Sequence, residues 1–327
     1  MSRARVYGAA GGPSLTRFLE PSTLARISNL DLLSRTVVEG FISGLHHSPF
    51  FGRSLDFAEH RQYMPGDDIR LIDWKLFART DRFYVKEFEA DTNTNCTILL
   101  DVSRSMSFGG GALRTPGPGQ PGGEEKGARS ISKLDYGRYL SACLAYFAHK
   151  QRDRVGFVTF DREVITHVPP AAKHLEEVLR AIDRIEPGGE GQLRAPLTRV
   201  AGRMRRRSIV VLISDFYEEP DAAFDAVSLL RGRGNDVIAF HLLDEAELRF
   251  PFGDAAEFED LETGERIALS PESAREAYRK LIEDHVATLR RRFSEARVDY
   301  HLFDTSVPLD YALSRYLSAR QRAAHVR

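Results

Sequence analysis

The sequence has few cysteines and almost no net charge. Cys96 and Cys143 are the two cysteines among 327 residues, too few for a disulfide framework. Each lies in a segment predicted to be a buried strand or helix, so we interpret both as small buried apolar residues, which fits a reducing cytoplasm. The 46 basic and 47 acidic residues give a net charge of -1. This balance excludes a global field that would attract nucleic acid or an anionic membrane.

The sequence also lacks the segments that mark several protein classes. No apolar run reaches the roughly 18 residues that a transmembrane helix needs. Residues 1–12 include Arg3 and Arg5 but no apolar stretch behind them, which argues against a signal peptide. We therefore expect a cytoplasmic protein. The Gly- and Pro-rich stretch at 109–129 has no Gly-Lys-Ser/Thr motif at the spacing of a phosphate loop, so we interpret it as a flexible insertion.

Short apolar runs alternate with amphipathic segments along most of the chain. The runs at 96–100, 154–160, 208–214, 236–242 and 298–303 predict strands, and helical patterns separate most of them. Strands that alternate with helices are typical of a parallel sheet covered on both faces. The sequence therefore predicts an α/β fold with a doubly wound, mainly parallel sheet.

One of these strands ends in a pattern of oxygen-bearing side chains. Asp101 follows the run at 96–100, and Ser103 and Ser105 come after it at alternate positions. An extended or turning backbone can aim alternate side chains at one point, and hard oxygen donors suit Mg²⁺ or Mn²⁺ rather than zinc. The alternative is a polar turn that binds nothing, since Asp and Ser are common turn residues.

A second buried strand, at 208–214, also ends at a carboxylate, Asp215. Ligands of open α/β sheets bind at the carboxyl ends of the strands, so two central strands would bring Asp101 and Asp215 into one crevice. Two carboxylates that lie close together either repel each other, which raises a pKa, or share a cation. We therefore predict a divalent metal site formed by Asp101, Ser103, Ser105 and Asp215.

Residues 41–92 are dense in charged and aromatic side chains and include the only tryptophan, Trp74. A metal or acid–base site on His46, His47 and His60 lacks any tight ligand spacing. The segment is otherwise a small subdomain tied together by ion pairs, or a surface that binds a partner, because aromatic and Arg side chains are enriched at interfaces. The candidate partner-binding residues are His46, Arg61, Asp67, Asp68, Arg70, Asp73, Trp74, Lys75 and Arg79.

Several motifs resemble a known protein family. The D-x-S-x-S pattern at 101–105 with the later Asp215 resembles the metal-ion-dependent adhesion site of the von Willebrand factor type A fold. The longer motifs resemble the bacterial family of unknown function number 58, which is associated with MoxR-type AAA+ ATPases. These motifs are GLHHSP at 44–49, FAEHRQYMPGDDIR at 57–70, IDWK at 72–75, ART at 78–80, VKEFE at 85–89 and DRVG at 153–156.

The resemblance implies a von Willebrand factor A-like domain with Mg²⁺ or Mn²⁺ at the carboxyl ends of its strands. The D-x-S-x-S residues and Asp215 match the ligands that such a site takes from the protein, and a partner's carboxylate completes the octahedron. The second loop departs from the pattern, because Gly191 stands where a threonine is expected. The adjacent Glu190 is a possible substitute ligand, or an internal carboxylate that blocks the site.

The resemblance further implies a non-enzymatic adaptor or co-chaperone of a MoxR-type AAA+ ATPase, which grips its partner or client proteins through the metal. One alternative is a metal-independent scaffold of the same fold. Another is a hydrolase, either a metal-dependent one that uses Asp101, Asp215 and a histidine or one with a serine nucleophile. The sequence has no G-x-S-x-G motif, and sequence alone places no histidine beside Ser103 or Ser105. Nucleic-acid binding through the arginines at 203–207 and the basic tail at 315–327 lacks aromatic interleaving and a basic net charge.

These patterns divide the chain into six segments. We expect a tail with short helices at 1–40 and the charged and aromatic subdomain at 41–92, followed by the main domain, which begins at 93–243 and is completed at 271–320. A β-hairpin insertion lies between these two parts at 244–270, and a second tail lies at 321–327.

Overall fold

The computed structural model describes residues 56–64, 72–89, 94–109, 131–204, 207–253, 256–262, 264–309 and 311–313. The short helices predicted within 1–40, most of the insertion at 109–129 and the tail at 321–327 lie outside these residues. No helix among the described residues is long and apolar enough to span a membrane.

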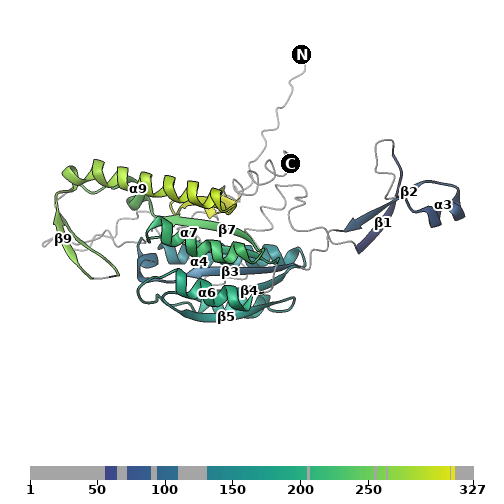
Figure 1. The fold of residues 1–327 in the computed structure, drawn as a ribbon, viewed down its shortest axis with the longest axis horizontal. Coiled ribbons are helices and arrows are strands. Elements are labelled where there is room, and N and C mark those ends of the chain that lie inside the picture. Colours follow the sequence, from purple (N-terminus) through teal and green to yellow (C-terminus); the bar gives the residue numbers. More distant parts are fainter. Residues whose placement is uncertain are drawn as a thin grey trace, which may run out of the picture.

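A six-stranded sheet forms the centre of the main domain, in the order β10-β7-β6-β3-β4-β5 (Figure 1). Five of its strands pair in parallel, and the edge strand β5 runs antiparallel to β4. This confirms the predicted mainly parallel sheet. The strands are β3 (Asn95–Asp101), β4 (Arg154–Phe160), β5 (Val164–Ala171), β6 (Ile209–Ser214), β7 (Asp236–Leu243) and β10 (Asp299–Asp304).

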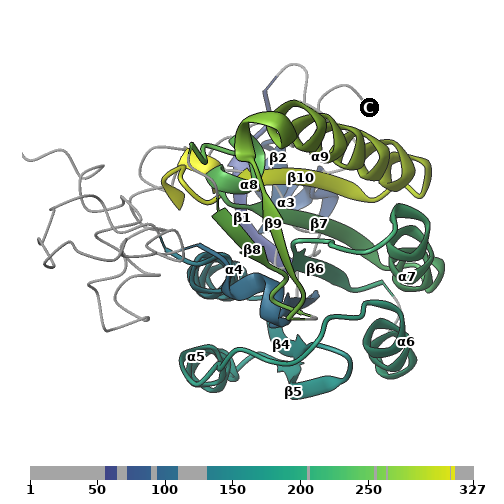
Figure 2. The same cartoon turned by 90° about the vertical axis from the view of Figure 1, so that its left-hand side faces the viewer.

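Helices cover both faces of this sheet (Figure 2). Buried side chains point to alternate faces along β3: Ile98 and Leu100 join the core formed with α4 and α5, whereas Leu99 joins the core formed with α6, α7 and α9. Both cysteines are buried and free, as predicted. The helices are α4 (Lys133–Lys150), α5 (Leu175–Asp183), α6 (Arg194–Arg203), α7 (Pro220–Gly232) and α9 (Pro271–Glu295).

The order of the strands reverses beside β3. From β3 the chain proceeds outward to β4 and β5, then returns to the other side of β3 to form β6, β7 and β10. A crevice opens outside the carboxyl ends of two strands at such a switch point, and open α/β sheets bind ligands there. The sheet topology therefore places the expected binding crevice at the carboxyl ends of β3 and β6.

The remaining elements are short. The predicted hairpin is present as β8 (Ala256–Glu259) paired with β9 (Arg266–Leu269). A separate two-stranded sheet joins β1 (Asp56–Gln62) to β2 (Tyr84–Glu89), with α3 (Trp74–Thr80) between them. Sequence patterns did not reveal β1, β2, α3, the turn η3 (Arg104–Ser107) or the helix α8 (Glu245–Arg249).

Helix α6 ends at Arg203, because the backbone of Met204 is extended. Residues 309 and 311–313 are also helical.

Candidate functional site

The predicted metal ligands lie together at the switch point. Asp101 is the last residue of β3, and Asp215 directly follows β6, which pairs with β3 in parallel. Both carboxylates, together with Ser103 and Ser105, line one small hollow of about 10 Å³. That volume holds about one water-sized sphere. The convergence predicted from the sequence is therefore present in the fold, although the hollow is narrow.

The carboxylate of Asp101 is buried and fixed by hydrogen bonds. The backbone N–H of Ser103 donates to its Oδ1 at 2.9 Å, and the Ser214 hydroxyl donates to its Oδ2 at 2.7 Å. Burial and the nearby charge of Asp215 raise the pKa of Asp101 to about 7, although both hydrogen bonds oppose this shift. A cation near Asp101 would relieve this penalty, because it favours the charged form of the carboxyl group.

The two serines of the D-x-S-x-S pattern face each other. The Oγ atoms of Ser103 and Ser105 are 3.1 Å apart, and both side chains are buried. Neighbouring ligands of an octahedral Mg²⁺ ion lie about 3 Å apart, since each is 2.0–2.1 Å from the metal. The spacing of the two hydroxyls therefore suits adjacent positions around one such ion.

A lysine that the sequence analysis did not single out occupies the opposite side of Asp215. The Nζ atom of Lys133 lies 2.8 Å from Asp215 Oδ2 and 2.6 Å from Glu247 Oε1, and the lysine is fully buried. Burial alone would lower the pKa of Lys133, but the two carboxylates outweigh it and raise the pKa, so the ammonium stays charged. Asp215 therefore has a built-in cation.

One sequence feature could have pointed to Lys133. It is the first residue of α4, where the helix dipole disfavours a cation, although Ser132 caps that helix properly. A lysine in that position needs compensating carboxylates. The second of them, Glu247, is itself held by α8, since its Oε2 accepts the backbone N–H of Asp244 at 2.7 Å.

A carboxylate from the β8–β9 hairpin, rather than Glu190 of the second loop, reaches the hollow. Glu262, in the turn of the β8–β9 hairpin, also lines the hollow, and the backbone N–H of Gly191 donates to its Oε2 at 3.3 Å. A Cβ at Gly191 would lie 3.0 Å from Ser103 Cβ and 3.1 Å from Glu262 Oε1. The glycine thus leaves the space in which Glu262 approaches Ser103, and a threonine side chain would not fit there unchanged.

Glu190 does not join this group. Its carboxylate lies 3.2 Å from Arg162 Nη1 at the surface, half of its side chain is exposed, and it does not line the hollow. Glu190 is therefore a predicted candidate ligand that does not lie with the others in the hollow. Glu262, far away in sequence, lies where an internal carboxylate was expected.

The oxygen atoms that a few side chains present to the hollow are of the kind that bind a small hard cation. Asp101, Ser103 and Ser105 would hold it, and the ion would act as a Lewis acid toward an acidic group of a partner. The described residues contain no cluster of three or more His, Cys, Asp or Glu side chains that could hold a metal. Metal affinity in this chain would therefore depend on the serine hydroxyls, because Lys133 already offsets the charge of Asp215.

Few of the candidate partner-binding residues can be placed. His46, Asp67, Asp68 and Arg70 lie outside the described residues, and for Arg61 and Lys75 the backbone alone is described. Asp73 accepts the backbone N–H of Leu76 at 3.0 Å, which caps α3, and Arg79 lies exposed in its last turn. Trp74 is 60% exposed and contacts the rings of Phe77 and Phe83 edge-on.

The family model described as "Protein of unknown function DUF58" matches residues 59–115 and 122–288. The chain belongs to the DUF58 family. The uncharacterized protein Rv1480 of Mycobacterium tuberculosis is 23% identical over 333 residues, which span 99% of this chain and 98% of the relative. YeaD of Bacillus subtilis is 39% identical over 51 residues, which cover 16% of this chain and 13% of the relative. Both relatives are described as uncharacterized proteins.

Two solved structures align with about 70% of this chain. BatB from Bacteroides thetaiotaomicron aligns over 70% of this chain and 99% of its own, with 17% identity and a TM-score of 0.45. The VWA domain of SpRpn10 aligns over 69% of this chain and 94% of its own, with 11% identity and a TM-score of 0.38. The fold of this DUF58 member rests on its own sheet order and helix layers, described above.

Proposed function

We propose that this protein is a non-enzymatic interaction module that grips an acidic group of a partner protein through Mg²⁺ or Mn²⁺ at the carboxyl ends of β3 and β6. The observation that carries the proposal is the meeting of Asp101, Ser103 and Ser105 in one hollow at the switch point of the sheet. The facing hydroxyls and the unfavourable charge of buried Asp101 both favour a cation there.

The chemistry of the hollow favours binding over catalysis. Among the described residues that line it there is no histidine, so the hollow contains no Ser–His pair of the kind that activates a serine hydroxyl in serine hydrolases. Each of those hydroxyls lies within hydrogen-bond distance of the other. A serine hydrolase would need a base and an oxyanion hole at the same place.

We further propose that the partner is a MoxR-type AAA+ ATPase, with the protein acting as its adaptor toward client proteins. The support for this partner class is the motif resemblance of residues 44–89 and 101–105. A second contact would lie on the small β1–β2 unit, where Trp74 and Phe83 are exposed. Exposed tryptophan side chains are frequent anchors of protein interfaces.

A metal-independent scaffold of the same fold is the second candidate, and Lys133 favours it. An internal ammonium that already pairs with Asp215 lowers the benefit that a divalent ion gains from that carboxylate. In this candidate the hollow is a rigid part of the fold that binds no ion, and the partner contacts the surface around it. The two candidates differ in whether chelators abolish partner binding.

Calorimetric titration of the chelator-treated protein with MgCl₂ and MnCl₂ tests the metal. We expect saturable binding that Asp101→Asn abolishes. The matched control is Asp304→Asn, because Asp304 ends β10 and accepts the backbone N–H of Ser306 at 2.9 Å in the same kind of D-x-S turn. Heat of binding that is absent from the wild type, or equally reduced in both variants, would exclude the metal site and leave the scaffold.

Affinity capture from a lysate of the native organism, followed by mass spectrometry, tests the partner. We expect an AAA+ ATPase that is lost with chelator and with Asp101→Asn. Trp74→Ala tests the second contact, and Phe83→Ala tests the neighbouring exposed aromatic side chain of the same contact. Capture of the ATPase that chelator leaves unchanged supports the scaffold, whereas capture of no ATPase rejects the adaptor role.

A further inference from the structure

A second cavity, at the amino ends of the strands, has the opposite chemistry from the Asp101 hollow. It measures about 410 Å³ and lies between the C-terminal end of α6 and the first residues of β3 and β4, with β5 as one wall. Cavities that bind small molecules start at about 300 Å³. It is therefore large enough for a small organic ligand.

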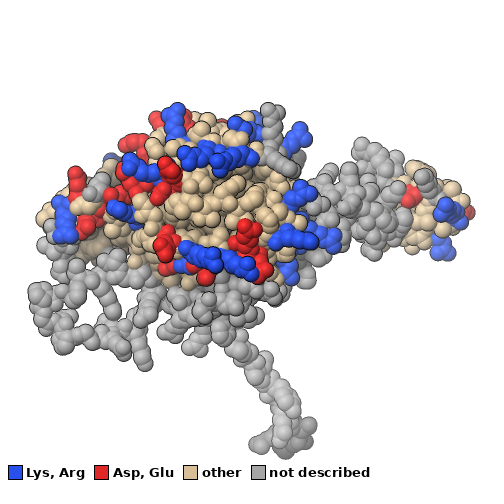
Figure 3. Space-filling view, turned by 90° about the horizontal axis from the view of Figure 1, so that it is seen from below, with Lys and Arg blue, Asp and Glu red and all other residues tan. Residues whose placement is uncertain are grey.

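Two arginines line this cavity, and no carboxylate does. Arg154 is the first residue of β4, and Arg203 is the last residue of α6. Within the described part of the chain, neither guanidinium group has an ion-pair partner. Figure 3 agrees with this asymmetry, because acidic side chains gather at the end of the domain that carries the β8–β9 hairpin and basic ones prevail toward the opposite end.

The end of a helix explains only one of the two arginines. The dipole of α6 favours a cation in its last turn, where Arg203 lies, but Arg154 begins a strand and gains nothing from it. Two guanidinium groups that share a cavity without a counter-ion repel each other, and a bound oxyanion would compensate both. Arginine binds carboxylate and phosphate oxygens well because its donors match their geometry.

Two further polar groups belong to the same cavity. His167 of β5 lines it, and burial together with the charge of Arg203 lowers the pKa of His167, so that its ring is an uncharged hydrogen-bond donor near neutral pH. At the floor, the buried hydroxyl of Thr97 has no hydrogen-bond partner among the described residues. Buried hydroxyls are rarely left unpaired, and such groups call for an explanation.

Apart from Asn95 and Ser208, the remaining residues that line the cavity are apolar. Val200 and Met204 line the cavity from the α6 side, and Pro169 and Pro170 line it from β5. Gly156 allows β4 to approach Pro170, since a Cβ at Gly156 would lie 2.8 Å from the backbone nitrogen of Pro170. The cavity therefore offers cationic groups together with apolar surface, which suits a ligand with an anionic head and a compact apolar body.

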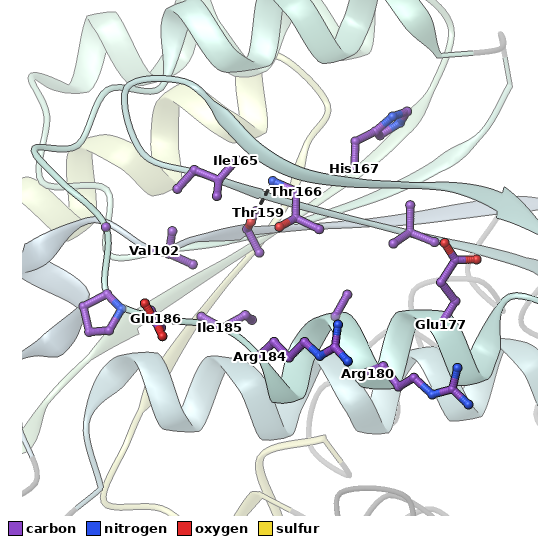
Figure 4. A pocket seen from close by; sticks show the side chains of 14 residues that line it. Val102, Thr159, Ile165, Thr166, His167, Glu177, Arg180, Arg184, Ile185 and Glu186 are labelled. Carbon is purple, nitrogen blue, oxygen red and sulfur yellow. Dashed lines mark hydrogen bonds between the residues drawn. The ribbon is translucent and has the colours of Figure 1, made fainter.

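The larger cavity between β5 and α5, about 730 Å³, lacks this asymmetry. It is lined by Arg180 and Arg184 but also by Glu177 and Glu186, and Arg180 is paired with Glu176 (Figure 4). In Figure 4 the His167 ring lies on the other side of β5 from these arginines. The acidic and basic side chains of the cavity between β5 and α5 balance one another, so we assign no ligand to that cavity.

We infer that the cavity at the amino ends of β3 and β4 binds a small organic oxyanion, a phosphate monoester or a carboxylate, through Arg154 and Arg203. This site is distinct from the Asp101 hollow, because the two lie at opposite ends of the same strands. It gives the protein a small-molecule input at one end of the sheet and a protein contact at the other.

Calorimetric titration with phenyl phosphate, benzoate and inorganic phosphate tests this inference. We expect phenyl phosphate or benzoate to bind saturably, and the preferred head group to distinguish the two sources of the oxyanion. Arg154→Gln and Arg203→Gln should each weaken that binding at least about tenfold, since a hydrogen bond to a charged group contributes roughly 1.5–3 kcal/mol.

The matched control is Arg194→Gln. Arg194 begins the same helix that Arg203 ends, and it does not line the cavity. Arg194→Gln and the metal-site variant Asp101→Asn should leave binding unchanged, so this inference and the proposed function can fail separately. Absence of saturable binding for all three probes, or equal weakening by Arg194→Gln, would overturn the inference. A single cooperative thermal unfolding transition in each variant would show that it is folded.

Discussion

The two ends of the central sheet differ in how their charged side chains are balanced. At the carboxyl ends, five acidic side chains lie around the Lys133 ammonium and the facing hydroxyls of Ser103 and Ser105, namely Asp101, Asp215, Glu218, Glu247 and Glu262. At the amino ends, Arg154 and Arg203 line a cavity without any carboxylate. The first end contains its own counter-ion, and the second has none among the described residues.

This difference separates stability from binding. A charge paired inside the protein holds the fold together, and removing either partner leaves the other buried and unpaired. A charge without an internal partner contributes little to folding and remains available to a ligand. We therefore expect substitutions at the carboxyl ends to change the free energy of unfolding, and substitutions at the amino ends to change ligand affinity.

The largest expected effect comes from Lys133→Met. The substitution keeps the length of the side chain but leaves Asp215 and Glu247 buried without their shared cation. We expect a loss of about 3–5 kcal/mol in the free energy of unfolding, measured by urea denaturation at pH 7.

Arg162→Met is the matched control, since it removes an exposed ion pair with Glu190 at the same rim. Exposed pairs contribute about 0–1 kcal/mol. Lys133→Met combined with Glu247→Gln should recover part of the loss. A loss below about 1 kcal/mol for Lys133→Met would show that water or another cation replaces the ammonium, and the comparison of the two ends would fail.

The next effect concerns pH and Asp101. Its pKa is raised from 3.8 to about 7 in the folded protein. The folded state therefore holds this proton more tightly than the unfolded state, and its contribution to stability is lost as pH rises from about 4 through 7. Asp101→Asn removes the titration. The free energy of unfolding of the variant relative to that of the wild type should therefore rise by about 2 kcal/mol as pH increases from 5 to 8.

Urea denaturation of both proteins at pH 5 and pH 8, without divalent ions, measures this gain. Burial lowers the pKa of His241 to about 3, so the stability linked to His241 is lost as pH falls toward 3, in the opposite sense. That contribution is common to both proteins and cancels in the difference. Equal pH dependence of the wild type and Asp101→Asn would mean that Asp101 stays ionised throughout this range.

The sequence allowed a correct prediction of the sheet and of the meeting of its two aspartates. Apolar runs mark the strands because a strand buried on both faces excludes polar side chains. Asp101 and Asp215 each follow such a run, and the switch point brings the two strand ends together. The local D-x-S pattern alone would not have sufficed, since Asp304 and Ser306 form the same turn at the end of β10.

The partners that complete the site could not be predicted, because they come from distant parts of the chain. Lys133 reaches Asp215 across 82 positions, and Gly191 meets Glu262 across 71. Neither pair has a local spacing that a sequence pattern records. Glu190 was the natural candidate because it adjoins Gly191, yet its side chain turns outward to Arg162.

A smaller effect is expected from Gly191→Ala, which tests how closely the hairpin approaches the hollow. The new Cβ would lie 3.0 Å from Ser103 Cβ and 3.1 Å from Glu262 Oε1, so the neighbours must move by a few tenths of an ångström. We expect a cost of about 1 kcal/mol in the free energy of unfolding. Glu262→Ala in the same chain should relieve part of it.

Gly202→Ala serves as the control for Gly191→Ala. Gly202 lies within α6, and a Cβ there meets nothing within 4 Å. Alanine should therefore stabilise the protein by roughly 0.5–1 kcal/mol, because glycine is a poor helix former. A double variant, Gly191→Ala with Glu262→Ala, that is no more stable than Gly191→Ala alone would place the clash at Ser103 rather than at the hairpin.

The smallest effect on stability is expected from Arg203→Gln, the counterpart of Lys133→Met at the other end of the sheet. Arg203 has no ion-pair partner within the described residues, and its favourable position at the end of α6 contributes only a few tenths of a kcal/mol. We expect the free energy of unfolding in phosphate-free buffer to change by less than about 0.5 kcal/mol. Adding an oxyanion that binds in the cavity should then stabilise the wild type and not the variant, because ligand binding to the folded state raises its stability. A loss above about 1 kcal/mol without any ligand would mean that Arg203 is held by a partner within the protein, and the contrast between the two ends would no longer hold.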